Sequence, residues 1–492
     1  MKSIRSSRIR PVSWSISYLL RCPLGISIVT SNSTALVSRT VSNRWRWVAV
    51  FVVLVVAAAG GTAYVVTRPA AQHRAAAVER PVVRPDALAA VASAGASEAT
   101  AAGVAAALSR ATADPAFGGS LTGMVVDAAT GQALLDRDGG APMTPASTAK
   151  LLTAAVALTA LGPTATLRTD VLRDGSTLYL RGGGDVTLTA KPPARATYPR
   201  PATVAALAAA TARSLGPAPG VTALCADVSA WSGPSSAPGW TPGYFTDGDI
   251  EAPTALEVDE GRLSRTSHAR AAHPARTALA DFAAALRTDG VAAQRTPCVK
   301  TAPSTATLVA SVASPPMSAL VARMLTASDN DLAEAIGRAI ATAAGRPASF
   351  AGEAAALTAG LSQLGVSTDE LRLVDASGLS RLDRVRAVTL VSVLRLAATQ
   401  PSLHGLLDGV PVAAATGTLA KRYRAKTTVA GAGVVRAKTG TLAGVNSLAG
   451  TVVDADGRLL VFAFFTDRAA SPSRAEAALD RLAAILAGCG CR

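Results

Sequence analysis

The chain has 492 residues, of which 49% are hydrophobic, and this material suffices for a large core divided over two or three domains. The formal net charge is +15, but residues 1–68 hold nine basic and no acidic residues, which leaves 39 basic against 33 acidic residues afterwards. No basic run with interleaved aromatic residues occurs, so the composition excludes a nucleic-acid-binding protein and favours a membrane-facing N-terminus.

The first predicted element is the apolar run 47–66, which contains twenty residues without a charge. As a helix it would span about 30 Å, the thickness of a bilayer core. Arg44 and Arg46 precede it, so the positive-inside rule places residues 1–46 in the cytoplasm and the rest outside. We predict a single-pass anchor in the cell membrane; a cleaved signal peptide with a secreted product, or a buried helix, are the alternatives.

The segments on either side of this run have no apolar periodicity. Residues 1–46 form a basic tail, which is either cytoplasmic or the product of a start site placed too far upstream. Residues 67–92 are rich in Ala, Pro, Val and Arg and are typical of a linker. The catalytic part is therefore expected to begin near residue 93.

The next segments predict a helix, a hairpin and a second helix. Residues 93–113 are alanine-rich and stop before Pro115, and residues 121–138 contain two apolar runs around an Asp-Ala-Ala-Thr-Gly turn. Residues 147–160 predict a helix with Ser147 at its N-cap position. Beyond residue 163 the pattern changes to short alternating runs between loops rich in Gly, Pro and Ser, which predicts a β-rich insertion over 163–311.

Helical periodicity returns in the last part of the chain and is followed by strand-like runs. Helices are predicted within 317–344 and 353–401, a hairpin within 447–467 and an amphipathic helix over 474–486. Few long βαβ units are apparent, so we predict an α+β fold with an antiparallel sheet flanked by helices. The predicted catalytic domain combines residues 93–162 and 312–492.

Five cysteines are present, none with the spacing of zinc ligands, and we expect neither a metal nor a cofactor. Cys225 and Cys298 both lie in the exported part, where a disulfide is the natural pairing; two unpaired buried thiols are the alternative. Such a bond could contribute about 4 kcal/mol, because it closes a long loop.

Three short patterns suggest chemistry: Ser147 with Lys150, Ser328 with Asn330, and Lys438-Thr439-Gly440. Each is common by itself. However, the chain has only seven lysines and four asparagines, and each pattern uses the one Lys or Asn that fits it. The similar stretch from Thr418 to Lys421 does not begin a long apolar helix, so we do not assign it a catalytic role.

The three patterns suit acyl transfer by a serine nucleophile. Ser147 and Lys150 are three residues apart on a helix and share a face, and burial beside a second cation, Lys438, would lower the pKa of Lys150 enough to make it a base. Ser328 can relay a proton, and Asn330 can hold Lys150 and a substrate amide. Lys438, Thr439 and Thr441 can bind a terminal carboxylate, and the N–H groups of Ser147 and Thr441 can form an oxyanion hole.

This motif set resembles that of penicillin-binding proteins. Together with SDNDLAEAI, DASGLSR and the long gap between Lys150 and Ser328, it makes residues 93–487 similar to the low-molecular-mass class C penicillin-binding proteins, the D-alanyl-D-alanine carboxypeptidase/endopeptidase family S13. The resemblance implies a transpeptidase-like core, peptidoglycan stem peptides as substrates and acylation by β-lactams. It also implies substrate binding by Thr439, Gly440, Thr441, Ser377 and Gly378.

Two other functions are compatible with parts of this pattern. A class A β-lactamase would have a Glu-x-x-x-Asn stretch between the second and third motifs, and no Asn occurs from 331 to 437. A cell-wall-binding protein without catalysis is disfavoured by the intact motifs. For Glu334 the sequence indicates support of its own helix, and for Trp240 packing within the insertion, with glycan contact as the alternative.

Overall fold

The computed structural model describes residues 98–190, 197–217, 220–264, 267–292 and 297–492. The predicted basic tail, membrane segment and linker all lie outside these residues. Within the described part of the chain, no helix is both long enough and apolar enough to cross a membrane.

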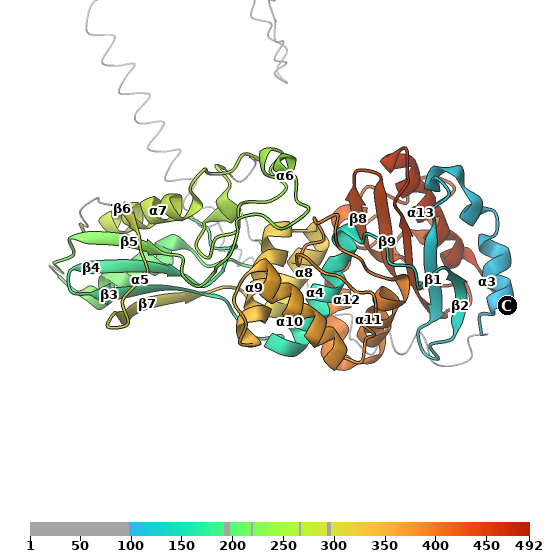
Figure 1. The fold of residues 1–492 in the computed structure, drawn as a ribbon, viewed down its shortest axis with the longest axis horizontal. Coiled ribbons are helices and arrows are strands. Elements are labelled where there is room, and N and C mark those ends of the chain that lie inside the picture. Colours follow the sequence, from blue (N-terminus) through green and yellow to red (C-terminus); the bar gives the residue numbers. More distant parts are fainter. Residues whose placement is uncertain (1–97, 191–196, 218–219, 265–266, 293–296) are drawn as a thin grey trace, which may run out of the picture. The chain divides into compact units, whose positions relative to one another are not determined.

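The first sheet has five antiparallel strands in the order β2-β1-β10-β9-β8 (Figure 1). Both predicted hairpins are confirmed in it, since β1 pairs with β2 and β9 pairs with β10. The strands are β1 (Thr122–Asp127), β2 (Ala133–Arg137), β8 (Arg436–Leu442), β9 (Val445–Val453) and β10 (Leu459–Thr466).

Strand β10 explains how this sheet is held. Alternate residues of a strand point to opposite faces, and every residue of β10 is buried. Val461, Ala463 and Phe465 join the core that contains α11, whereas Phe462 and Phe464 join the core that contains α13 and α3. The sheet is therefore covered on both faces, and the predicted α+β class is confirmed.

The helices that accompany this sheet largely follow the predicted pattern. The expected C-terminal helix is present as α13. The helix expected over 93–113 is shorter within the described residues, because Thr100 caps it by accepting from the Gly103 N–H at 3.0 Å. The helices are α3 (Ala101–Leu108), α4 (Lys150–Val156), α8 (Met317–Ala327), α9 (Asn330–Ala343), α10 (Phe350–Gln363), α11 (Ala387–Thr399), α12 (His404–Gly409) and α13 (Pro472–Gly488).

The start of the serine helix differs from the prediction. Ser147 is not an N-cap residue but lies inside a 3-10 turn, η3 (Ala146–Ala149), that leads into α4. Ala146 adopts a φ of 48°, and the Thr148 hydroxyl donates to the Pro145 carbonyl at 2.7 Å. The tight turn after Pro145 therefore replaces the side-chain cap and leaves the Ser147 hydroxyl free for other contacts.

The second sheet has the order β6-β5-β4-β3-β7 and belongs to the predicted insertion. It is mixed, because β4, β5 and β6 run parallel to one another. Parallel neighbours need a crossover, and α5 and α7 supply two of them. The elements are β3 (Arg168–Asp174), β4 (Thr177–Gly182), β5 (Ala223–Asp227), β6 (Pro297–Val299), β7 (Thr307–Ala313), α5 (Val204–Leu215) and α7 (Pro274–Thr288).

The predicted insertion therefore contains a five-stranded sheet, but it also contains two long helices that were not predicted from the sequence. The amphipathic helices α5 and α7 cover one face of this sheet. Leu207 of α5 and Phe282 of α7 pack there in a hydrophobic core separate from those of the first sheet. The expected disulfide between Cys225 and Cys298 is present and joins the parallel neighbours β5 and β6. A second disulfide, Cys489–Cys491, was not predicted.

Short segments complete the described chain. They are α6 (Pro242–Thr246), the π turn η4 (Ala157–Leu161) and the 3-10 turns η1 (Ala111–Ala113), η2 (Pro115–Phe117), η5 (Asp259–Gly261), η6 (Pro401–Leu403), η7 (Gly417–Leu419) and η8 (Val429–Gly431).

Candidate active site

Lys150 lies at the centre of the three sequence motifs. Its side chain is fully buried, and its amine lies 3.0 Å from Ser147 Oγ, 2.6 Å from Asn330 Oδ1 and 2.7 Å from the Ser377 carbonyl oxygen. Ser147 and Asn330 are only partly buried. The amine is thus enclosed by protein, while the hydroxyl that it contacts is accessible from one side.

The surroundings of Lys150 change its protonation. Burial lowers its pKa to about 8, against the opposing effect of nearby carboxylates, of which Asp375 and Glu334 are the strongest. A lysine with this pKa is partly neutral near pH 7 and can accept a proton. The geometry therefore places the Ser147 hydroxyl next to an amine whose pKa is lowered by burial; Lys438, which was expected to add to this effect, is not among its causes.

Lys438, on β8, forms the other side of the site. It is fully buried, and its amine donates to Ser328 Oγ and to the Thr439 carbonyl, both at 2.8 Å. Burial lowers the pKa of Lys438 well below its usual value, and the charges of Lys150 and Arg422 lower it further. The structure thus brings all five predicted catalytic residues into one site.

Ser328 takes its place through an unusual backbone conformation. It follows α8 with a φ of 59°, in the left-handed region that non-glycine residues seldom adopt. The next residue, Asp329, caps α9 by accepting from the Leu332 N–H at 2.9 Å. The sharp turn between the two helices points Ser328 toward Lys438 and Asn330 toward Lys150.

The predicted carboxylate-binding residues lie along β8. This strand ends the first sheet and pairs with β9 on one side. The Thr439 hydroxyl donates to Thr418 Oγ1 at 2.9 Å, and the Thr441 hydroxyl is exposed and donates to Glu476 Oε1 at 3.0 Å. A Cβ at Gly440 would approach the Pro145 carbonyl oxygen to 2.7 Å, so only glycine lets the strand pass this close to the Ser147 turn.

Ser377 and Gly378 do not occupy the substrate-binding position expected of them. The Ser377 side chain is fully buried, and its carbonyl oxygen accepts from Lys150. Gly378 has a φ of 80°, and a Cβ there would meet the Ala146 carbonyl oxygen at 2.0 Å. Both residues lie behind the Ser147 turn because the loop folds against it, and they support Lys150.

The loop that contains Ser377 is held by residues whose role the sequence did not reveal. Asp375 accepts from the backbone N–H groups of Gly378 at 2.7 Å and Ser380 at 2.6 Å. The Trp240 indole also donates to Asp375, at 2.7 Å, and its ring packs on Phe350. The packing predicted for Trp240 is confirmed, but it connects the insertion to the loop behind Lys150.

One group of carboxylates in the described chain has the spacing of metal ligands. Oxygens of Glu260, Asp329 and Asp331 lie within 4.8 Å of one another. Each carboxylate is already paired with a guanidinium: Glu260 and Asp329 with Arg323, and Asp331 with Arg270. Because the arginines supply the opposite charge, this cluster gives no reason to place a metal there.

The fold and the Ser147–Lys150 pair define a serine enzyme of the penicillin-binding class. The sequence model of the D-Ala-D-Ala carboxypeptidase 3 (S13) family matches residues 104–272 and 262–486. The chain therefore belongs to this family of serine carboxypeptidases.

Individual relatives agree with this assignment. The chain is 41% identical over 389 residues to a carboxypeptidase of Mycobacterium tuberculosis, covering 77% of this chain and 82% of that protein. It is 40% identical over 381 residues to carboxypeptidase DacB of Mycolicibacterium smegmatis, covering 76% and 81%. The crystal structure of penicillin binding protein 4 from Haemophilus influenzae is similar in fold, with a TM-score of 0.63, 23% identity, and coverage of 77% and 97%.

Proposed function

We propose that the protein breaks an amide bond that follows D-alanine in peptidoglycan stem peptides, either to release a terminal D-alanine or to cut a peptide cross-link. The reaction passes through an acyl-enzyme on Ser147, and penicillins acylate the same residue. The contact that carries this proposal is the 3.0 Å approach of Ser147 Oγ to the buried amine of Lys150. In the acylation step, Ser147 Oγ attacks the carbonyl carbon of the D-alanine whose amide bond is broken, and neutral Lys150 takes the hydroxyl proton.

The leaving amine receives its proton from the other side of the site. Ser328 Oγ lies next to Lys438 and can donate its own proton to the leaving nitrogen while taking one from Lys438. Asn330 holds Lys150 through its carbonyl oxygen. Before the second step, Lys150 releases to solvent the proton that it took from Ser147, and Lys438 regains one from solvent. Water then attacks the ester carbon, and neutral Lys150 takes a proton from the water and passes it to the Ser147 oxygen, which leaves as the hydroxyl.

The negative charge on the carbonyl oxygen needs donors during both steps. We assign this role to the backbone N–H groups of Ser147 and Thr441, and the close approach of β8 to the Ser147 turn supports the assignment. One such donor can be worth about 3 kcal/mol in the transition state.

The residues near Lys438 favour a substrate that ends in a carboxylate. Lys438 is buried and donates to the Ser328 hydroxyl and the Thr439 carbonyl, and it has no carboxylate partner among the described residues. An arriving carboxylate would supply the missing opposite charge and bind the exposed Thr441 hydroxyl. This supports the terminal D-alanine of a stem peptide as the group that lies there.

The proposed location is the outer face of the cell membrane. Its support is the apolar run 47–66 with basic residues before it, together with two disulfides in the exported part. Fractionation of cells should find the protein in the membrane; mature protein in the medium that begins near Ala63 would instead establish cleavage.

A fluorescent penicillin tests the proposed chemistry. The full-length protein should become covalently labelled, and the Ser147→Ala variant should not. A folded wild-type protein that takes no label would contradict the assignment. An acyl-enzyme that persists for many minutes would exclude an efficient β-lactamase. In a separate experiment, the products of purified muropeptides would distinguish release of terminal D-alanine from cleavage of cross-links.

A further inference from the structure

Helix α9 carries a buried charged group that the proposed reaction does not use directly. The Arg338 guanidinium lies 3.1 Å from Glu334 Oε2 and 2.9 Å from Glu353 Oε2, and all three side chains are 1% exposed or less. Arg338 also lies over the rings of Trp231 and Phe350. One guanidinium thus forms ion pairs with two carboxylates. Burial, together with the charge of Glu334, raises the pKa of Glu353 well above its usual value.

The second oxygen of Glu334 points toward the active site. Oε1 accepts from the Ala376 N–H at 3.1 Å and from the Ser377 N–H at 2.9 Å. The Ser377 carbonyl is the group that receives the Lys150 amine at 2.7 Å. Hydrogen bonds therefore run from Arg338 through Glu334 and one peptide segment to Lys150, and the earlier prediction that Glu334 only supports its own helix is too narrow.

We propose that Glu334 is a positioning residue for acylation, which holds the Ala376–Ser377 backbone in the place where it fixes the Lys150 amine. Glu353 contacts the same arginine, but among the described residues its Oε1 has no hydrogen-bond partner, so it does not hold this peptide segment. This inference rests on the proposed role of Lys150. The charged groups that face Lys150 are Asp375, Glu334, Asp329, Asp331 and Lys438.

Acylation by a chromogenic β-lactam, measured against pH, tests the inference with Glu334→Gln and the matched control Glu353→Gln. Glu334→Gln should lower the plateau rate about tenfold, as loss of a supporting partner does at other catalytic sites. It should also move the midpoint of the acid limb to lower pH, because a charge that raises the pKa of Lys150 is removed. Glu353→Gln should leave the profile unchanged.

Two results would overturn the inference: a folded Glu334→Gln protein with the wild-type profile, or the same shift in Glu353→Gln. If Glu334→Gln does not fold, the Glu334→Asp variant is used to test the positioning role instead. It keeps the charge but shortens the reach, so it should lower the plateau and leave the midpoint in place; an unchanged plateau would contradict us. Failure of the wild-type protein to be acylated would instead refute the proposed function.

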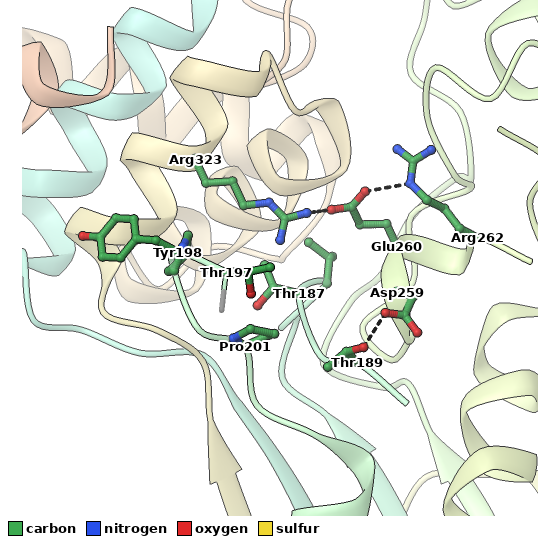
Figure 2. Close-up of a pocket in the computed structure, with 11 residues that line it drawn as sticks. Thr187, Thr189, Thr197, Tyr198, Pro201, Asp259, Glu260, Arg262 and Arg323 are labelled. Atoms are coloured by element: carbon green, nitrogen blue, oxygen red, sulfur yellow. Dashed lines mark hydrogen bonds and ion pairs between the residues drawn. The ribbon is translucent and has the colours of Figure 1, made fainter. Parts of the chain in front are cut away.

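A separate pocket of about 360 Å³ lies where loops of the insertion meet α8 (Figure 2). Its wall contains the turn Asp259-Glu260-Gly261, in which the three φ values are 54°, 56° and 66°. Two consecutive non-glycine residues in this region are strained, and such strain is concentrated at functional sites. The turn is held by ion pairs from Glu260 to Arg262 and Arg323.

The chemistry of this pocket favours an uncharged ligand rich in hydroxyl groups. The carboxylates of Asp259 and Glu260 balance the two arginines, the buried hydroxyls of Thr187 and Thr189 donate to Asp185 and Asp259, and the largely exposed Tyr198 ring lies at the rim. A sugar ring, with hydroxyls at its edge and apolar C–H groups on its face, matches this lining. We infer that the pocket binds a saccharide segment of peptidoglycan, which deepens the proposed function by adding a contact outside the reaction centre.

Titration with N-acetylglucosamine tetramer, followed by calorimetry, tests this site in wild-type protein, Tyr198→Ala and the control Leu263→Ala, whose exposed side chain does not line the pocket. Tyr198→Ala should weaken binding at least fivefold without changing hydrolysis of a short synthetic peptide. Absence of binding to the wild-type protein, or equal binding by Tyr198→Ala, would refute the saccharide site. Peptide hydrolysis reports separately on the proposed function.

Discussion

The two sides of the active site contain one buried lysine each, but the charges around them are opposite. Lys150 faces Asp375 and Glu334, and these carboxylates limit the fall of its pKa to about 8. Lys438 faces Lys150 and Arg422, which add to the effect of burial and lower its pKa further. The comparison indicates a division of work: Lys150 exchanges a proton near neutral pH, and Lys438 would be stabilised as a cation by a bound anion.

Replacement of Ser147, the nucleophile between the two lysines, should have the largest effect on acylation. Ser147→Ala removes the nucleophile, so covalent labelling by a fluorescent penicillin should fall at least ~10³-fold, while the melting temperature stays close to that of the wild type. If this variant were still labelled, the nucleophile would be another residue, and the roles assigned to Lys150 and Lys438 would be wrong.

Replacement of the base should have the next largest effect. Lys150→Met keeps most of the side-chain volume and removes the amine, so the acylation rate should drop by about 10²–10⁴-fold. Stopped-flow acylation by a chromogenic β-lactam measures this. A loss of less than tenfold would mean that another group takes the Ser147 proton.

On the other side, Lys438→Met should mainly weaken recognition of the substrate's carboxylate. A charged hydrogen bond of about 1.5–3 kcal/mol corresponds to a KM increase of roughly 10–100-fold for a peptide ending in D-alanine. The same peptide with an amidated C-terminus should show a much smaller change. Equal losses for both peptides would assign Lys438 to proton transfer alone.

The pKa of Lys150 sets the pH dependence of the wild-type enzyme. Because the neutral amine is required, the acylation rate should rise about tenfold per pH unit below pH 8 and level off above it. In the unfolded chain the pKa is 10.5, so between about pH 8 and 10.5 the unfolded state binds more protons, and the free energy of unfolding contributed by Lys150 rises with pH. Denaturation by urea at several pH values should show this slope reduced in Lys150→Met.

The smallest effect on catalysis is expected from the insertion. The Cys225→Ser/Cys298→Ser variant opens a loop with a sequence separation of 73 and should lose about 4 kcal/mol of stability. The acylation rate at 25 °C should stay within twofold of the wild type, because neither cysteine contacts the site. A slower rate with an unchanged urea midpoint would show that β5 and β6 help to order the active site.

Much of the fold could be predicted from local patterns. The hairpins β1–β2 and β9–β10 and helix α13 follow from apolar periodicity and turn residues, which act over a few neighbours in the chain. The insertion could not be predicted in this way. Its parallel strands pair across long crossovers, and nothing in the short runs of β4 and β5 distinguishes a parallel partner from an antiparallel one.

The sequence by itself determined which side chains could react, because lysine and asparagine are scarce and each motif uses a particular one of them. It also determined the family, since the motifs recur in a fixed order. Only the tertiary structure decided what surrounds each lysine: Glu334 comes from 184 residues beyond Lys150, and Ser377 from 227. Charge and burial depend on distance in space, so the difference between Lys150 and Lys438 exists only in the folded protein.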